Sequence, residues 1–188
     1  MVVQFQPVVN LSDDQLFDFC QANRELRIER NEHGELIIMP PAGSESSSHN
    51  AEITGQLRDW AKRDGTGKVF DSSGGFTLPN GAMRSPDAAW LPLSKWKTLT
   101  PKQRKKFAPL CPDFIIELRS PSDSLKALQE KMREYRANGA EFGLLVDPEK
   151  KRVHVYRPGR RAQVFDAPQT VACDPVLPGF VLDLREIW

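Results

Sequence analysis

The segment from Pro112 to Pro121 constrains the fold of this chain more than any other, because it places acidic residues inside an apolar run. Side chains alternate between the two faces of a β-strand. One face would carry Asp113, Ile115, Glu117 and Arg119, and the other Phe114, Ile116 and Leu118. A buried carboxylate is costly unless it is paired or holds a metal. The segment therefore predicts a buried strand with one chemically active face.

The composition is that of an ordinary globular protein, with 39% hydrophobic and 27% charged residues in a chain of 188. This length predicts one domain over residues 1–188. No apolar run approaches the roughly 18 residues that span a bilayer, and the N-terminal segment lacks the charged start and cleavage site of a secretory signal. We therefore expect a cytoplasmic protein without a membrane partner. Three widely spaced cysteines predict free thiols rather than disulfides or a zinc site.

Periodicity and turn residues predict helices and strands along the whole chain. Helices are expected from the Ser12 cap to about Asn23, after a polar lead at 43–48 until Gly65, and over 125–138 before Gly139, with short ones over 94–108. Strands are expected as a hairpin at 26–30 and 36–39, then at 68–71, 75–78, 83–91, 141–146 and 152–156. A helix between strands 113–119 and 141–146 would make them parallel. The pattern predicts a mixed α/β sheet flanked by helices, with the acidic strand central.

Two carboxylates are candidates for a shared site. Asp87 lies on the predicted strand 83–91, and Glu117 lies on the acidic strand, followed two residues later by Arg119. Carboxylates converging from neighbouring strands suit a hard divalent cation such as Mg²⁺. A nearby cation can orient water or stabilise charge on a phosphate. These parts are typical of a metal-dependent phosphodiesterase.

Each candidate also has a purely structural interpretation. Asp87 follows a proline, where acidic residues are common in turns, and Glu117 could form an internal ion pair with Arg119 or Lys131. Asp113 would be a strand-entry residue and Asp123 a helix cap. Basic clusters at 102–106 and 150–161 are consistent either with phosphate contacts or with solvated loops.

Several motifs occur in a recognisable order. They are Ser85-Pro-Asp87, Pro112-Asp-Phe-Ile-Ile-Glu117, Ser120-Pro-Ser-Asp123, Lys131-x-x-x-Tyr135, Gly139 and Val146-Asp-Pro148. The chain thereby resembles the Uma-type family of restriction-endonuclease-like proteins, within the PD-(D/E)XK nuclease superfamily, from about the first hairpin to Tyr156. The resemblance implies a restriction-endonuclease-like mixed sheet flanked by helices, with extra β-hairpins.

The resemblance also implies roles for individual residues. Asp87 and Glu117 would hold Mg²⁺ or Mn²⁺, with the backbone carbonyl of Leu118 as a third ligand. The lysine that usually follows the second acid is replaced by Arg119, which would be a poor general base. Lys131 matches the position to which this family moves the lysine, and Tyr135 lies on the same helical face.

Glu45 is a further candidate, since the Gly43-Ser-Glu-Ser lead with Asn50 resembles a subgroup of the same family. Alternatively, Glu45 is a first-turn acid that favours the helix dipole. The implied function is metal-dependent endonucleolytic hydrolysis of DNA. Two alternatives stay open, a catalytically inactive descendant that binds nucleic acid or a protein partner, and a structural protein. A homodimer also remains open.

Overall fold

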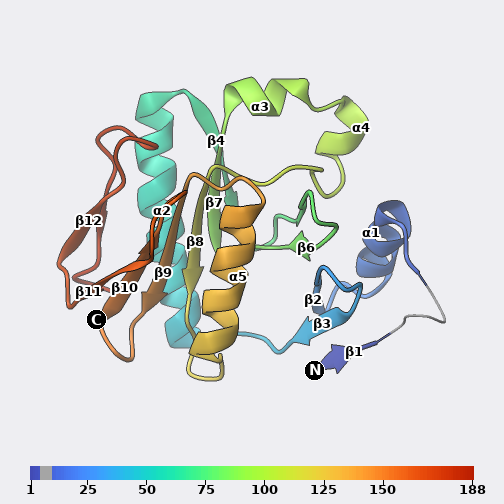
Figure 1. Ribbon diagram of the computed structural model, residues 1–188, viewed down its shortest axis with the longest axis horizontal. Helices are drawn as coiled ribbons and strands as arrows, with labels where there is room; N and C mark the ends of the chain where they lie inside the picture. Colours follow the sequence, from blue (N-terminus) through green and yellow to red (C-terminus); the bar gives the residue numbers. More distant parts are fainter. Residues whose placement is uncertain (5–9) are drawn as a thin grey trace.

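The acidic segment forms strand β8 (Phe114–Leu118) inside a six-stranded mixed sheet of the computed structural model, which describes residues 1–4 and 10–188 (Figure 1). The strand order is β11–β10–β9–β8–β7–β4, with β4 at Gly67–Asp71, β7 at Ala88–Pro92, β9 at Phe142–Asp147, β10 at Arg152–Tyr156 and β11 at Gln163–Asp166. Strand β8 pairs in parallel with β9 and antiparallel with β7. The predicted central position and parallel partner of the acidic strand are thus confirmed.

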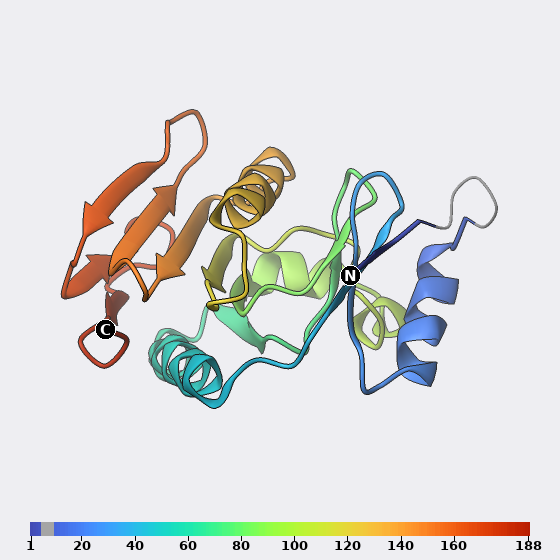
Figure 2. The ribbon, with the colours of Figure 1, turned by 90° about the horizontal axis from the view of Figure 1, so that it is seen from below.

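Two long helices cover opposite faces of this sheet, α2 (Ser44–Asp64) and α5 (Leu125–Ala137), as Figure 2 shows. Phe114 and Ile116 join the hydrophobic core beneath α2. Ile115, between them, packs in the separate core that contains Met132 and Tyr135 of α5. Both faces of β8 therefore carry apolar residues, because a strand covered on both sides packs against an apolar layer on each face.

Helix α5 begins and ends where the sequence predicts, but its cap differs. The hydroxyl of Ser124 accepts a hydrogen bond from Ala127 N at 3.4 Å and is the N-cap. Asp123, expected in that role, instead accepts hydrogen bonds from the backbone N and the hydroxyl of Ser120 at 2.9 and 2.6 Å. Asp123 therefore closes the turn between β8 and α5, and the expectation of a helix cap there is wrong by one residue.

A second, five-stranded sheet lies beside the first, in the order β1–β3–β2–β6–β5. Its strands are β1 (Val2–Val3), β2 (Arg27–Arg30), β3 (Leu36–Met39), β5 (Phe76–Thr77) and β6 (Met83–Arg84). Strands β2 and β3 form the predicted hairpin. Helix α1 (Asp13–Ala22) follows the Ser12 cap and buries Leu16 against Ile28 of this sheet.

Two boundaries differ from those predicted. The expected strand 83–91 is divided into β6 and β7, which belong to different sheets. Pro86 lies between them, and proline cannot donate a ladder hydrogen bond. Asp87 therefore lies in the bend before β7 rather than on a strand. Helix α2 begins at Ser44, so the polar residues expected to lead into the helix form its first turns.

Short elements complete the chain. They are α3 (Leu93–Thr98), α4 (Pro101–Arg104) and the antiparallel pair β12 (Thr170–Ala172) and β13 (Val181–Asp183). The three cysteines are free thiols, as predicted. No helix in the described part of the chain is long and apolar enough to cross a membrane.

Candidate active site

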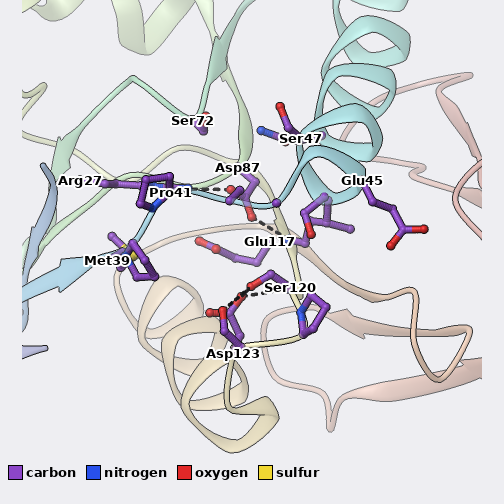
Figure 3. A pocket seen from close by; sticks show the side chains of 18 of the residues that line it. Arg27, Met39, Pro41, Glu45, Ser47, Ser72, Asp87, Glu117, Ser120 and Asp123 are labelled. Atoms are coloured by element: carbon purple, nitrogen blue, oxygen red, sulfur yellow. Dashed lines mark hydrogen bonds and ion pairs between the residues drawn. The ribbon is translucent and has the colours of Figure 1, made fainter. Parts of the chain in front are cut away.

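A cavity of about 540 Å³ opens where β8 ends and where both α2 and α5 begin (Figure 3). Its lining includes Arg27, Glu45, Asn50, Asp87, Glu117, Leu118, Ser120 and Lys131. Three of the main sequence candidates, Asp87, Glu117 and Lys131, thus share one cavity. Open cavities with a few convergent polar groups are the usual location of binding and catalytic sites.

The carboxylate of Asp87 is anchored at both oxygens. Its Oδ2 accepts a hydrogen bond from the backbone N of Leu118 at 2.8 Å, which ties the bend before β7 to the end of β8. Its Oδ1 accepts one from Arg27 Nη2 at 3.1 Å. The split at Pro86 is what frees Asp87 from the strand ladder and lets its side chain reach the neighbouring strand end.

Glu117 projects from the α5 face of β8 and is almost entirely buried, with 3% of its side chain exposed. Its Oε1 lies 2.8 Å from Lys131 Nζ and accepts a hydrogen bond from the Tyr135 hydroxyl at 2.9 Å. Lys131 and Tyr135 are one helical turn apart on α5, which places both on the face toward the sheet. The structure therefore brings together the strand acid and the helix pair.

The protonation of this cluster follows from its burial. Burial raises the pKa of Glu117 to about 7; Lys131 opposes this shift, whereas the charges of Asp87 and Glu29 add to it. Burial alone would lower the pKa of Lys131, but attraction to Glu117 and Glu29 outweighs it and raises that pKa. Lys131 is therefore an ammonium cation at neutral pH, beside a carboxyl group that titrates there.

Glu29 of β2 is a member of this cluster that sequence reasoning missed. It is buried, and its Oε1 accepts a hydrogen bond from Lys131 Nζ at 2.8 Å. Its Oε2 accepts one from Arg84 Nη1 at 3.1 Å, and the backbone N of Ser85 donates to Oε1 at 2.9 Å. Burial would raise the pKa of Glu29, but Lys131 and Arg84 outweigh burial and lower it. Lys131 is thus held between two carboxylates from different sheets.

The alternating pattern of strand β2 could have identified Glu29 and Arg27 as candidate site residues. The strand reads Arg-Ile-Glu-Arg, so two charged residues share a face of a strand that the hairpin pattern already predicts. Arg27 pairs with Asp87, and Glu29 pairs with Lys131. Charged residues at alternate positions of a buried strand indicate partners elsewhere, although the sequence does not say which.

Two other candidates lie apart from the cluster. Arg119 Nη1 forms ion pairs with Asp147 at 2.9 Å and Glu149 at 3.1 Å, and Arg119 does not line the cavity. Glu45 is exposed at the rim, on the first turn of α2, and Figure 3 shows its carboxylate directed away from Asp87 and Glu117. Neither side chain joins Asp87, Glu117 and Lys131 in this arrangement.

The donor set is compatible with a hard divalent cation that keeps several of its waters. Within residues 1–4 and 10–188, no group of three or more histidine, cysteine or acidic side chains is arranged to hold a metal ion. Asp87 and Glu117, however, provide two carboxylates in one cavity, and Leu118 is part of the same lining. Mg²⁺ commonly binds through one or two carboxylates and retains water ligands. A divalent charge here would also offset the burial, and the added repulsion from Asp87 and Glu29, that raise the pKa of Glu117.

Two residues that line the cavity, Arg27 and Asn50, have polar side-chain atoms without a partner in the described part of the chain. Arg27 Nε and Asn50 Oδ1 are buried atoms without a hydrogen-bond partner among the described residues. The first turn of α2, with Ser44, Ser46 and Ser47, faces the same cavity. The N-terminus of a long helix carries free backbone N–H groups and favours anions. The cavity can therefore receive an anionic, hydrogen-bonding ligand next to the carboxylate pair.

Comparisons with known proteins identify a family and a similar fold. Residues 13–185 match the Uma2 family, described as "Putative restriction endonuclease". The fold is similar to the crystal structure of a "putative nuclease belonging to DUF820" from Anabaena variabilis ATCC 29413. That similarity has a TM-score of 0.71 at 22% sequence identity and covers 85% of this chain and 88% of the other. No curated protein matches the chain.

Proposed function

Because the chain belongs to the Uma2 family of restriction-endonuclease-like proteins, we propose that it is a metal-dependent endonuclease that hydrolyses DNA phosphodiester bonds. The observation that carries the proposal is the convergence of Asp87, Glu117 and Lys131 in one open cavity. Two carboxylates and a cation beside an anion-favouring helix terminus are the groups that phosphodiester hydrolysis requires.

Asp87 and Glu117 would hold Mg²⁺ or Mn²⁺, with the Leu118 carbonyl completing the protein ligands. When bound, the divalent cation lowers the pKa of water and neutralises charge that develops on the phosphate. The protein contributes fixed positions. Asp87 is held by the backbone N of Leu118, and Glu117 is held by the Tyr135 hydroxyl. Both carboxylates therefore keep their orientation without help from the substrate.

Lys131 is assigned an electrostatic role. Its pKa is raised by Glu117 and Glu29 against the effect of burial, so the amine stays protonated and is not a general base. A protonated amine can donate hydrogen bonds to a phosphate oxygen or to the attacking water. Arg119 is not given this role, because Asp147 and Glu149 already pair with its guanidinium group.

The proposal is tested with the Glu117→Gln variant. We expect the parent to nick or cut plasmid DNA with Mg²⁺ or Mn²⁺, and the variant to lose at least about a hundredfold in rate because a metal ligand is gone. Glu141→Gln is the matched control, since Glu141 is exposed and lies outside the cavity. Thermal unfolding of each variant shows whether it is folded. Equal cleavage by Glu117→Gln and the parent would contradict the assignment.

One observation favours a second candidate function. Glu117 Oε1 already contacts Lys131 and Tyr135. These contacts would stabilise the Glu117 carboxylate equally well in a protein that no longer binds a metal. A catalytically inactive protein that binds nucleic acid or a protein partner would use the same fold in this way. Calorimetric titration of the parent with MgCl₂ and MnCl₂ separates the two, because only the nuclease requires metal binding that the Glu117→Gln variant lacks.

A further inference from the structure

A second cavity, of about 440 Å³, lies between helix α5 and the turn that joins β10 to β11. Its lining contains four arginines, two from the helix (Arg133 and Arg136) and two from the turn (Arg160 and Arg161). The other lining residues are Tyr156, Gly159 and Ala162, so among the described residues no acidic side chain lines the cavity. We refer to the four arginines as the arginine pocket.

The guanidinium groups of the arginine pocket are available to a ligand. Among the described residues, none of the four arginines forms a salt bridge. Arg136 Nη1 donates a hydrogen bond to the backbone carbonyl of Arg160 at 2.7 Å, which holds the turn against α5. Gly159, with φ of +66°, adopts the left-handed conformation that this turn needs. The pocket therefore has a fixed frame and unpaired charges.

Several other basic residues of the predicted clusters already have partners within the protein. Lys102 and Lys106 pair with Asp14, and Arg104 stacks over the Trp96 ring at 5.1 Å. In the same stretch as the turn, Arg152 pairs with Asp166, and Arg157 lies over the Phe142 ring at 4.3 Å. Only tertiary packing adds two helix arginines to Arg160 and Arg161, which are adjacent in the sequence.

We propose that the arginine pocket binds phosphate groups of a nucleic-acid backbone. The planar guanidinium group presents paired donors that match the oxygens of phosphate, and several unpaired cations around one cavity concentrate that attraction. The phosphate class follows from the arginines themselves. That the phosphates belong to a nucleic acid rests on the proposed function, in which DNA is the substrate.

The arginine pocket is separate from the candidate active site. Arg133 follows Lys131 by two positions, which places the two side chains about 200° apart around the helix. Lys131 faces Glu117 and Glu29, whereas Arg133 lines the second cavity on the far side of α5. A phosphate bound in the arginine pocket would thus anchor the strand at a distance from the cut position without touching the carboxylates.

The test is equilibrium binding of a labelled DNA duplex to the full chain, measured by fluorescence anisotropy without divalent metal and over a range of salt concentrations. The variant is Arg133→Ala/Arg161→Ala, which leaves the Arg136 link to the turn intact. The matched control is Arg58→Ala/Arg63→Ala, which removes the same charge from exposed positions of α2 away from both cavities. We expect about a tenfold loss of affinity in the variant and little change in the control.

The salt dependence identifies the kind of contact. Each lost phosphate contact should reduce the slope of log K against log salt by about 1, so the variant should show a shallower slope than the control. Equal affinity and slope in both double variants would overturn the proposal. Displacement of the duplex from the parent by polyglutamate, or by inorganic pyrophosphate, at the same charge concentration would also overturn it, because an acidic peptide or a free phosphate would then suffice.

The outcome is independent of catalysis. If the parent binds the duplex through the arginine pocket but cuts no DNA with Mg²⁺ or Mn²⁺, the proposed nuclease activity is wrong and the proposed phosphate site is supported. If the parent cuts DNA and the Arg133→Ala/Arg161→Ala variant binds and cuts like the control, the proposed phosphate site is wrong and the proposed nuclease activity is supported.

Discussion

The two sides of helix α5 carry positive charge in opposite circumstances. Toward the sheets, Lys131 is largely buried and lies 2.8 Å from both Glu29 and Glu117. Toward the turn after β10, Arg133 is exposed and has no ion-pair partner among the described residues. A buried charge is costly unless it is paired within the folded protein. An exposed charge is stabilised by water and stays available to a ligand.

The difference indicates what each side can do. The buried cluster couples Lys131 to two carboxylates, so a change in any one of the three alters the others. This coupling fixes geometry, which suits chemistry at a single phosphate. The arginine pocket has no such coupling, which suits attraction to a flexible or extended polyanion. The following predictions test this contrast, in order of decreasing effect.

Substitution of Lys131 should show the contrast most clearly. In Lys131→Ala, Glu29 and Glu117 lose their shared cation, and we expect the free energy of unfolding to fall by about 3–5 kcal/mol. Arg133→Ala on the same helix should change it by less than about 0.5 kcal/mol, because an exposed, unpaired side chain is lost. Urea denaturation at pH 8 measures both. Equal losses would show that burial and pairing do not distinguish the two sides.

Glu29→Gln should have an intermediate effect. Arg84 retains Glu134 at 2.6 Å, and Lys131 retains Glu117 at 2.8 Å, so both cations keep one carboxylate. We expect a loss of about 2 kcal/mol in the free energy of unfolding, as for a buried charged hydrogen bond. Glu32→Gln, an exposed position on the same hairpin, is the control and should be nearly neutral. A neutral Glu29→Gln would mean that Lys131 is held by Glu117 alone.

The stability of the metal-free protein should depend on pH through Glu117. Its folded pKa of about 7 lies above the ordinary value of 4.5, so the folded state retains a proton that the unfolded state releases. This contribution is fully present below about pH 4.5 and is lost as pH rises through 7, by on the order of 2 kcal/mol. In Glu117→Gln the loss between pH 5 and 8 should disappear. Thermal unfolding of both proteins across that range checks the sign; parallel profiles would exclude Glu117 as the titrating group.

Tyr135→Phe should have the smallest effect in the buried cluster. It removes one hydrogen bond to Glu117 Oε1, while Lys131 remains 2.8 Å from the same oxygen. We expect a loss of about 1 kcal/mol in the free energy of unfolding, with DNA cleavage retained. Chemical denaturation gives the first value and a plasmid assay the second. A variant without cleavage activity but of parental stability would move Tyr135 from a supporting role into the chemistry.

Local sequence patterns determined a large part of the fold. Strict alternation set the two faces of β8, and the capping residue Ser12 and the terminal Gly139 set the ends of α1 and α5. These features depend on residues that are near one another in the chain, which periodicity and capping rules describe well. The meeting of Asp87 and Glu117 was predicted from their places on neighbouring strands, and Lys131 was added by the motif resemblance. The catalytic roles of all three stay predictions.

Tertiary structure alone brought Glu29 to Lys131 and assembled the arginine pocket. Glu29 of strand β2 and Lys131 of helix α5 are 102 positions apart, and the arginine pocket joins a helix to a turn 24 positions away. Pro86 divides an apparently continuous strand between two sheets, and that division places Asp87 at the end of β8. Local composition fixes which face a side chain takes, but the partner of a buried charge depends on how whole elements pack. For this reason the acidic strand β8 could be recognised in the sequence. Glu29, the second carboxylate that contacts Lys131, could not.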